Sequence, residues 1–197
     1  EKLLIIDNPD PHRGTEKLTH LSAAEYVQCG FLTQQEFEGL FKFSFVRNPW
    51  ARLVSEYRYR NYLSHRNFKD FVMNKLPPPG RDDNYRHIMP QTQMLYDDDG
   101  RLLVDFVGKF ENLQADFDEV CTRLGIETSA LPHVNSSDKS SRELKRNMRN
   151  FLYRNDETDL HLYTDFYDDE TRDFVADMYR NDIENFGYSF EDALRNR

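Results

Sequence analysis

The stretch FVRNPWARLVSEYRY, residues 45–59, predicts a strand that turns sharply into a helix. Its first residues complete the run KFSFV at 42–46, which has the aromatic and β-branched composition that strands favour. Asn48 can cap a helix with its side-chain oxygen, and Pro49 suits the first helical position, where no backbone donor is lost.

The predicted helix has an apolar face and a polar face. The apolar residues follow the i, i+3, i+4, i+7 spacing of a stripe that packs against a core. This stripe consists of Trp50, Leu53, Val54 and Tyr57. By the 100° helical step a second group lies off the stripe: Arg52, Ser55, Tyr59 and Tyr62.

Arg47 stands where the strand ends and the free N–H groups of the helix begin. Backbone donors, the helix dipole and a guanidinium all favour an anion such as phosphate at this place. The residues alone also allow a simpler interpretation, a capped core helix with solvated arginines.

Composition limits the class of protein. The 197 residues with 38% hydrophobic content suffice for one domain with a core, and we expect a single domain over residues 1–197. The two cysteines, Cys29 and Cys121, exclude a disulfide framework. A net charge of −9 disfavours a nucleic-acid partner, and no apolar run approaches the roughly 20 residues of a membrane span.

The order of predicted elements indicates an α/β architecture, because strands and helices alternate. We expect strands at 3–6, 42–46 and 102–107, and helices from the Ser22/Glu25 capping box to Gly30, at 33–40, from Pro49 onward, at 112–124, at 140–152 with a basic stripe, and at 170–185. The segment after PPPG (77–80), which includes RHIMPQTQML at 86–95, is expected to be irregular.

Common catalytic and metal-binding motifs are absent. The chain has no GxxxxGK[ST], GxGxxG, HExxH or CxxC, so we expect no triphosphate loop, no dinucleotide fold and no metal site. Among the histidines, His20, His87 and His133 lie beside a predicted turn or helix start, whereas His12, His65 and His161 have loop or surface settings.

The run Arg47-Asn48-Pro49 followed by Arg52-Leu53-Val54-Ser55-x-Tyr57 resembles the 3′-phosphate-binding motif of sulfotransferases. Specifically, it resembles the carbohydrate sulfotransferase group that includes heparan 2-O-sulfotransferase and bacterial relatives. Further segments resemble that group in the same order from His20 to Phe190: THLSAAEY, HIMPQ, DFVGKFENLQADFDEV, LPHVNSS and YTDFYDDETRDFVADMYRNDIENFGYSF. The order of several motifs is more specific than any single one.

The resemblance implies a P-loop-like three-layer α/β fold with a mainly parallel sheet between helices. It implies a donor, 3′-phosphoadenosine 5′-phosphosulfate (PAPS), whose 3′-phosphate Arg47 and Ser55 hold, and adenosine 3′,5′-bisphosphate as product. The acceptor is expected to be a hydroxyl group, most often of a carbohydrate. His20 matches the base of the family and His87 is a second candidate, while Lys139 and Arg142 follow NSS in a loop that can close over the nucleotide.

The first strand of the family and its Lys-Thr-Gly loop, which holds the 5′-phosphosulfate, have no match before His20. We therefore expect an N-terminally incomplete fold, either a portion of a longer enzyme or a relative without phosphosulfate binding. A non-catalytic module for a nucleotide or an anionic sugar is the alternative; a nucleotide-kinase-like enzyme lacks its triphosphate loop here. The resemblance implies the cytoplasm for a bacterial protein and the Golgi lumen for a eukaryotic one.

Overall fold

A computed structural model of the chain describes residues 8, 10, 14–59, 67–131 and 162–192. Within them it contains short 3₁₀ segments, helices and two strands in the following order: η2 (Leu18–His20), α1 (Glu25–Gln28), α2 (Gln34–Gly39), β1 (Phe43–Val46), α3 (Pro49–Tyr59), α4 (Phe68–Asn74), α5 (Asp83–Ile88), α6 (Gln91–Leu95), β2 (Phe106–Lys109), η4 (Phe110–Asn112), α7 (Leu113–Leu124), η5 (Tyr163–Phe166), α9 (Asp169–Met178) and α10 (Arg180–Phe186). The expected strand at 3–6 and the basic helix at 140–152 lie outside the described residues.

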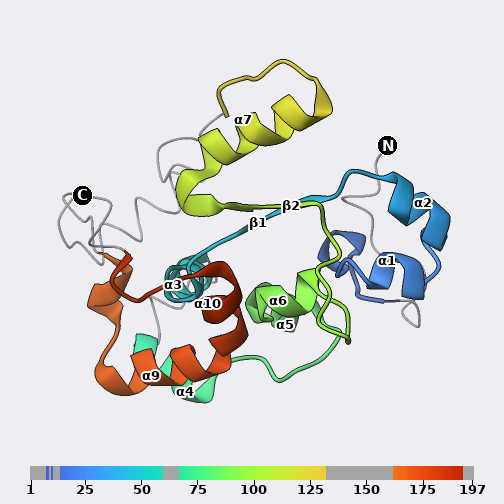
Figure 1. The fold of residues 1–197 in the computed structure, drawn as a ribbon. Helices are drawn as coiled ribbons and strands as arrows, with labels where there is room; N and C mark the ends of the chain where they lie inside the picture. Colours follow the sequence, from blue (N-terminus) through green and yellow to red (C-terminus); the bar gives the residue numbers. More distant parts are fainter. Residues whose placement is uncertain (1–7, 9, 11–13, 60–66, 132–161, 193–197) are drawn as a thin grey trace, which may run out of the picture.

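The two described strands form a small parallel sheet. Phe43 of β1 pairs with Phe106 of β2, and Val46 pairs with Lys109. In Figure 1, α7 lies on one side of this strand pair, whereas α3, α6 and α10 lie on the other side. The described residues combine helices with a pair of parallel strands, which confirms the expected α/β class.

Helix α3 is the centre of the main core. The four residues of its predicted apolar stripe are all at most 4% exposed, so the stripe is confirmed. They pack against α4, α5 and α9 in one cluster whose other buried members are Phe68, Phe71, Val72, Tyr85, Ile88, Val175 and Tyr179. Asn48 caps α3 as predicted, because its Oδ1 accepts hydrogen bonds from the N–H groups of Trp50 and Ala51 at 3.1 and 3.3 Å.

The expectation of irregular structure at 86–95 is wrong. The segment contributes to two short helices, α5 and α6, which meet at Met89 and Pro90. Asp82 caps α5 through the N–H groups of Asn84 and Tyr85. The N-terminus of α6 has no cap of its own, and its donors bond to the distant Asp182 instead. A cap from another element leaves no local sequence signal.

The strand expected at 102–107 begins later, at Phe106. Asp105 sets this boundary, because its carboxylate accepts from the backbone N–H of Lys42 at 2.7 Å and its own N–H donates to the carbonyl of Lys42. Leu102 forms only an isolated antiparallel bridge with Tyr96. The hydrophobic residues from 102 to 104 therefore precede the sheet.

The helix expected at 170–185 is two helices, because Tyr179 has a non-helical backbone between α9 and α10. Tyr179 is 2% exposed, and its hydroxyl donates to the carbonyl of Ile88. Beyond this break, the aromatic end of the chain packs onto the core as expected, with the Phe190 ring 5.5 Å from that of Trp50. Long-range contacts thus override a continuous helical pattern.

A buried ion pair joins the segment that carries His20 to helix α5. The guanidinium of Arg86 donates to both carboxylate oxygens of Glu25, at 2.6 and 2.9 Å, and the Arg86 side chain is 5% exposed. Glu25 also accepts from the N–H of Ser22, which is the bond expected of the predicted capping box, but α1 begins only at Glu25, so Ser22 does not cap it. Glu25 therefore serves both the local turn and the tertiary contact.

We expect Asp182→Ala to lower the free energy of unfolding by about 2–4 kcal/mol, because it leaves two buried N–H groups unpaired. The Asp182 side chain is fully buried and accepts from the N–H groups of Gln91 and Thr92 at 2.8 and 2.7 Å. Urea unfolding measures the change. Glu184→Ala, which alters an exposed residue of the same helix, is the control and should shift stability by less than about 0.5 kcal/mol. Equal stability of the two variants would contradict the capping role.

We expect Glu25→Ala to destabilise the protein by about 3–5 kcal/mol, since it leaves the buried Arg86 guanidinium without its counter-charge. Asp97→Ala, which removes a more exposed ion pair with Arg101, is the comparison and should cost no more than about 1 kcal/mol. Thermal unfolding of both variants gives the ranking. A loss for Glu25→Ala as small as that for Asp97→Ala would show that the pair does not anchor the segment.

Candidate functional site: an anion cavity beside two histidines

Arg47 and Ser55 line one cavity of about 300 Å³. The turn through Asn48 and Pro49 brings the end of β1 next to the second turn of α3, so two residues eight apart in sequence face the same space. The other residues around the cavity are Arg52, Glu56, Tyr59 and His87. The structure therefore brings three of the predicted site residues together: Arg47, Ser55 and His87.

The Arg47 guanidinium is partly buried, and burial lowers its pKa, with the positive charges of Arg58 and Arg52 acting in the same direction. Glu111 opposes this effect. Within the described residues, the guanidinium contacts the Phe110 ring, 4.6 Å from its Cζ, and no carboxylate oxygen lies within salt-bridge distance. The Ser55 hydroxyl likewise has no hydrogen-bond partner among these residues. A partly desolvated cation and a hydroxyl donor are thus available to an anion.

Arg52, by contrast, is occupied. Its guanidinium donates to the backbone carbonyls of Met89 and His87 at 2.8 and 2.9 Å. These two bonds hold the C-terminal end of α5 against α3. The second arginine of the RNPWAR run therefore fixes the position of His87 rather than offering its charge to the cavity.

Each of the two candidate histidines is bonded to a carboxylate through Nδ1. His20 Nδ1 lies 2.8 Å from Asp83 Oδ1, and His87 Nδ1 lies 3.1 Å from Glu56 Oε2. An ionised carboxylate only accepts hydrogen bonds, so each Nδ1 carries the proton and Nε2 remains available. The two imidazole rings meet edge to face, with centroids 5.0 Å apart.

The histidines differ in their relation to the cavity. His87 lines it, whereas His20 reaches it through its ring contact with His87. Tyr59, which is 75% exposed, stacks on the ring of His87, with the two centroids 6.0 Å apart. Lys139 and Arg142, the other predicted nucleotide ligands, lie outside the described residues.

Sequence reasoning missed the two carboxylates that hold the histidines. Glu56 carried a usable signal, because it follows Leu53 by three residues and so falls beside the apolar stripe, where a charged residue needs a partner. Its side chain is indeed 8% exposed. Asp83 carried no comparable signal, since it is one of two adjacent aspartates at a helix start and only the fold selects it for His20.

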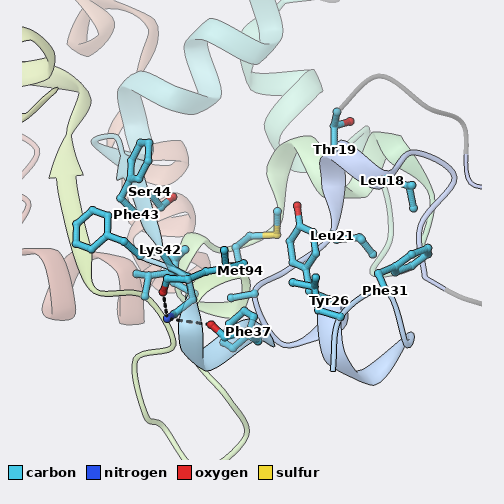
Figure 2. A pocket seen from close by; sticks show the side chains of 16 residues that line it. Leu18, Thr19, Leu21, Tyr26, Phe31, Phe37, Lys42, Phe43, Ser44 and Met94 are labelled. Atoms are coloured by element: carbon cyan, nitrogen blue, oxygen red, sulfur yellow. Dashed lines mark hydrogen bonds between the residues drawn. The ribbon is translucent and has the colours of Figure 1, made fainter. Parts of the chain in front are cut away.

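A second cavity, of about 580 Å³, lies beside β1 and has a different chemistry (Figure 2). Apolar and aromatic side chains line it, among them Leu21, Tyr26, Phe31 and Phe37. Its charged residue, Lys42, is already bonded to the carbonyls of Phe37 and Leu40 and to the carboxylate of Asp105. This cavity offers no free charge to an anion, so the space at Arg47 is the better candidate for a phosphate.

Two further expectations can be compared with the described part of the chain. No group of three or more histidine, cysteine or acidic side chains within it has the arrangement of a metal site. None of the helices described has the length and apolar character required to cross a membrane.

Comparison with known proteins gives one family. The profile of the "Sulfotransferase family" matches residues 12–189, which include every described site residue. A protein of Archaeoglobus fulgidus whose function is uncharacterised is 30% identical over 109 residues, a match that covers 51% of this chain and 81% of that protein. No solved structure matches the chain. The chain belongs to the sulfotransferase family.

Proposed function

We propose that the protein is a PAPS-dependent sulfotransferase that transfers a sulfuryl group to a hydroxyl of an acceptor. The observation that carries the proposal is the cavity in which Arg47 and Ser55 are available to an anion while His87 borders it and touches His20. Arg47 and Ser55 bind the 3′-phosphate of the donor, through charge-assisted and hydroxyl hydrogen bonds. Membership of the sulfotransferase family supports the donor, which that family generally uses.

In this proposal His20 is the general base. Its Asp83 partner fixes Nδ1–H, so Nε2 can take the proton of the acceptor hydroxyl. The acceptor oxygen then forms a bond to sulfur, and the bond between sulfur and the 5′-phosphate oxygen breaks. The products are a sulfate ester, adenosine 3′,5′-bisphosphate and the proton on His20. Asp83 stabilises the imidazolium that forms.

The finer assignments rest on the resemblance of the motifs to the heparan 2-O-sulfotransferase-like group. They are a carbohydrate acceptor, nucleotide contacts from Lys139 and Arg142, and a P-loop-like three-layer fold with further parallel strands. The helices on both sides of the β1–β2 pair in Figure 1 support the layered fold. A non-catalytic module that binds a nucleotide or an anionic sugar is the alternative, and it would bind without transferring sulfate.

We expect Arg47→Ala to weaken binding of adenosine 3′,5′-bisphosphate by about 1.5–3 kcal/mol, because a charge-assisted hydrogen bond to the 3′-phosphate is lost. Ser55→Ala should cost about 0.5–1.5 kcal/mol, the value of one hydrogen bond. Isothermal titration calorimetry measures both, with unchanged thermal unfolding as evidence of an intact fold. Arg101→Ala removes an exposed positive charge that does not line the cavity and is the control. Equal affinity of wild type and Arg47→Ala would reject the phosphate site.

We expect His20→Ala to lower the rate of sulfate transfer by about 10²- to 10⁴-fold, the usual contribution of a general base. The affinity for adenosine 3′,5′-bisphosphate should stay near that of wild type, since His20 does not line the cavity. A melting temperature near that of wild type would show that the variant keeps its fold. The assay uses the full-length protein, PAPS and a panel of hydroxyl acceptors. Transfer that persists at the wild-type rate would exclude His20 as the base. Binding without transfer by the wild type would favour the non-catalytic module.

A further inference from the structure

We propose that His87 is a ligand of the same phosphate as Arg47 and Ser55, with Glu56 as its positioning residue. This inference rests on the proposed function and adds to it a role for His87 that differs from that of a base. The protonated imidazole donates from Nε2 to the 3′-phosphate, while Nδ1–H stays bonded to Glu56. The ligand class is a nucleotide with a phosphate on the 3′-oxygen.

The location of His87 supports this role. His87 lines the cavity of about 300 Å³ together with Arg47 and Ser55, and its side chain is 28% exposed. A cavity of this size is large enough for a phosphate group, and His87 forms part of its wall. Two bonds from Arg52 to the carbonyls of His87 and Met89 fix the backbone there.

The orientation of the ring also supports this role. Glu56 is 8% exposed and lies 3.1 Å from His87 Nδ1, so it keeps that nitrogen as a donor and fixes the direction of the ring. Ser55 and Glu56 are neighbours on α3. One turn of helix therefore supplies both a phosphate ligand and the carboxylate that orients a second one.

His20 differs from His87 in its position relative to the cavity. His20 has the same kind of partner, a carboxylate at Nδ1, but it does not line the cavity. The two histidines therefore have similar chemistry and different positions. We therefore assign the acceptor side of the site to His20 and the nucleotide side to His87.

In this role both ring nitrogens of His87 donate, Nδ1 to Glu56 and Nε2 to the 3′-phosphate. Charged and titratable groups face its ring from several elements. They are Glu56, Tyr59 and Arg52 on α3, Arg47 at the end of β1, and His20 of η2 with Asp83 behind it. These groups are the same in wild type and in the His87 variants, so the difference in affinity between those proteins reports on His87.

The experiment measures binding of adenosine 3′,5′-bisphosphate and adenosine 5′-monophosphate to wild type, Arg47→Ala, His87→Ala, His87→Gln and Arg101→Ala by calorimetry. We expect His87→Ala to lose about 10-fold in affinity for the bisphosphate. Affinity for the monophosphate, which lacks the 3′-phosphate, should not change. Arg101→Ala, which removes an exposed positive charge that does not line the cavity, is the control and should match wild type for both nucleotides. Thermal unfolding confirms that each variant folds, and His87→Gln keeps a neutral donor should the alanine variant not fold.

The outcomes separate this inference from the proposed function. If Arg47→Ala loses affinity and both His87 variants bind the bisphosphate as wild type does, the phosphate site stands and the role of His87 is overturned. An equal loss for both nucleotides would also overturn it, because the 3′-phosphate would not be the group recognised. If wild type binds neither nucleotide, the proposed function fails and the inference fails with it.

Discussion

Asn48 is the residue on which the arrangement of the site depends. It is 1% exposed and bonds in four directions: its Oδ1 caps α3, its Nδ2 donates to the carbonyl of Ser189 and to Asp192, and its backbone N–H donates to Glu111. The turn between β1 and α3 is thereby held by the C-terminal segment and by the segment after β2. Because Arg47 precedes this turn and Ser55 follows it, the separation of the two proposed phosphate ligands is set by a fully bonded buried amide.

Helix α3 joins the core to the chemistry. Its apolar stripe packs into the main hydrophobic cluster, and the opposite side presents Ser55 and Tyr59 to the cavity, while Arg52 bonds to the carbonyls of Met89 and His87. Glu56 lies between these faces and reaches His87. A helix held by large apolar burial loses little freedom when a ligand binds, so its polar side chains are positioned in advance of binding.

The histidines depend on contacts between distant segments. His87 is held by Arg52 and Glu56 of α3, whereas His20 is held by Asp83 and by the Glu25–Arg86 pair that fixes its segment to α5. Helix α5 is therefore shared by both. This sharing allows two imidazoles from positions 67 residues apart in sequence to touch, with a carboxylate behind each.

The sequence by itself determined the strand–turn–helix at 42–59, its Asn48 cap, its buried stripe and the position of Ser55 off that stripe, because these follow from local spacing and hydrogen bonding. Membership of the sulfotransferase family was also predicted from ordered motifs.

Only the tertiary structure decided the helices at 83–95, the break at Tyr179 and the pairing of Glu56 and Asp83 with the histidines. The physical reason is that the cap of α6 comes from Asp182, 91 residues away from Gln91, and the carboxylate of His20 lies 63 residues along the chain. Such partners are brought together by core packing, and no local pattern records them.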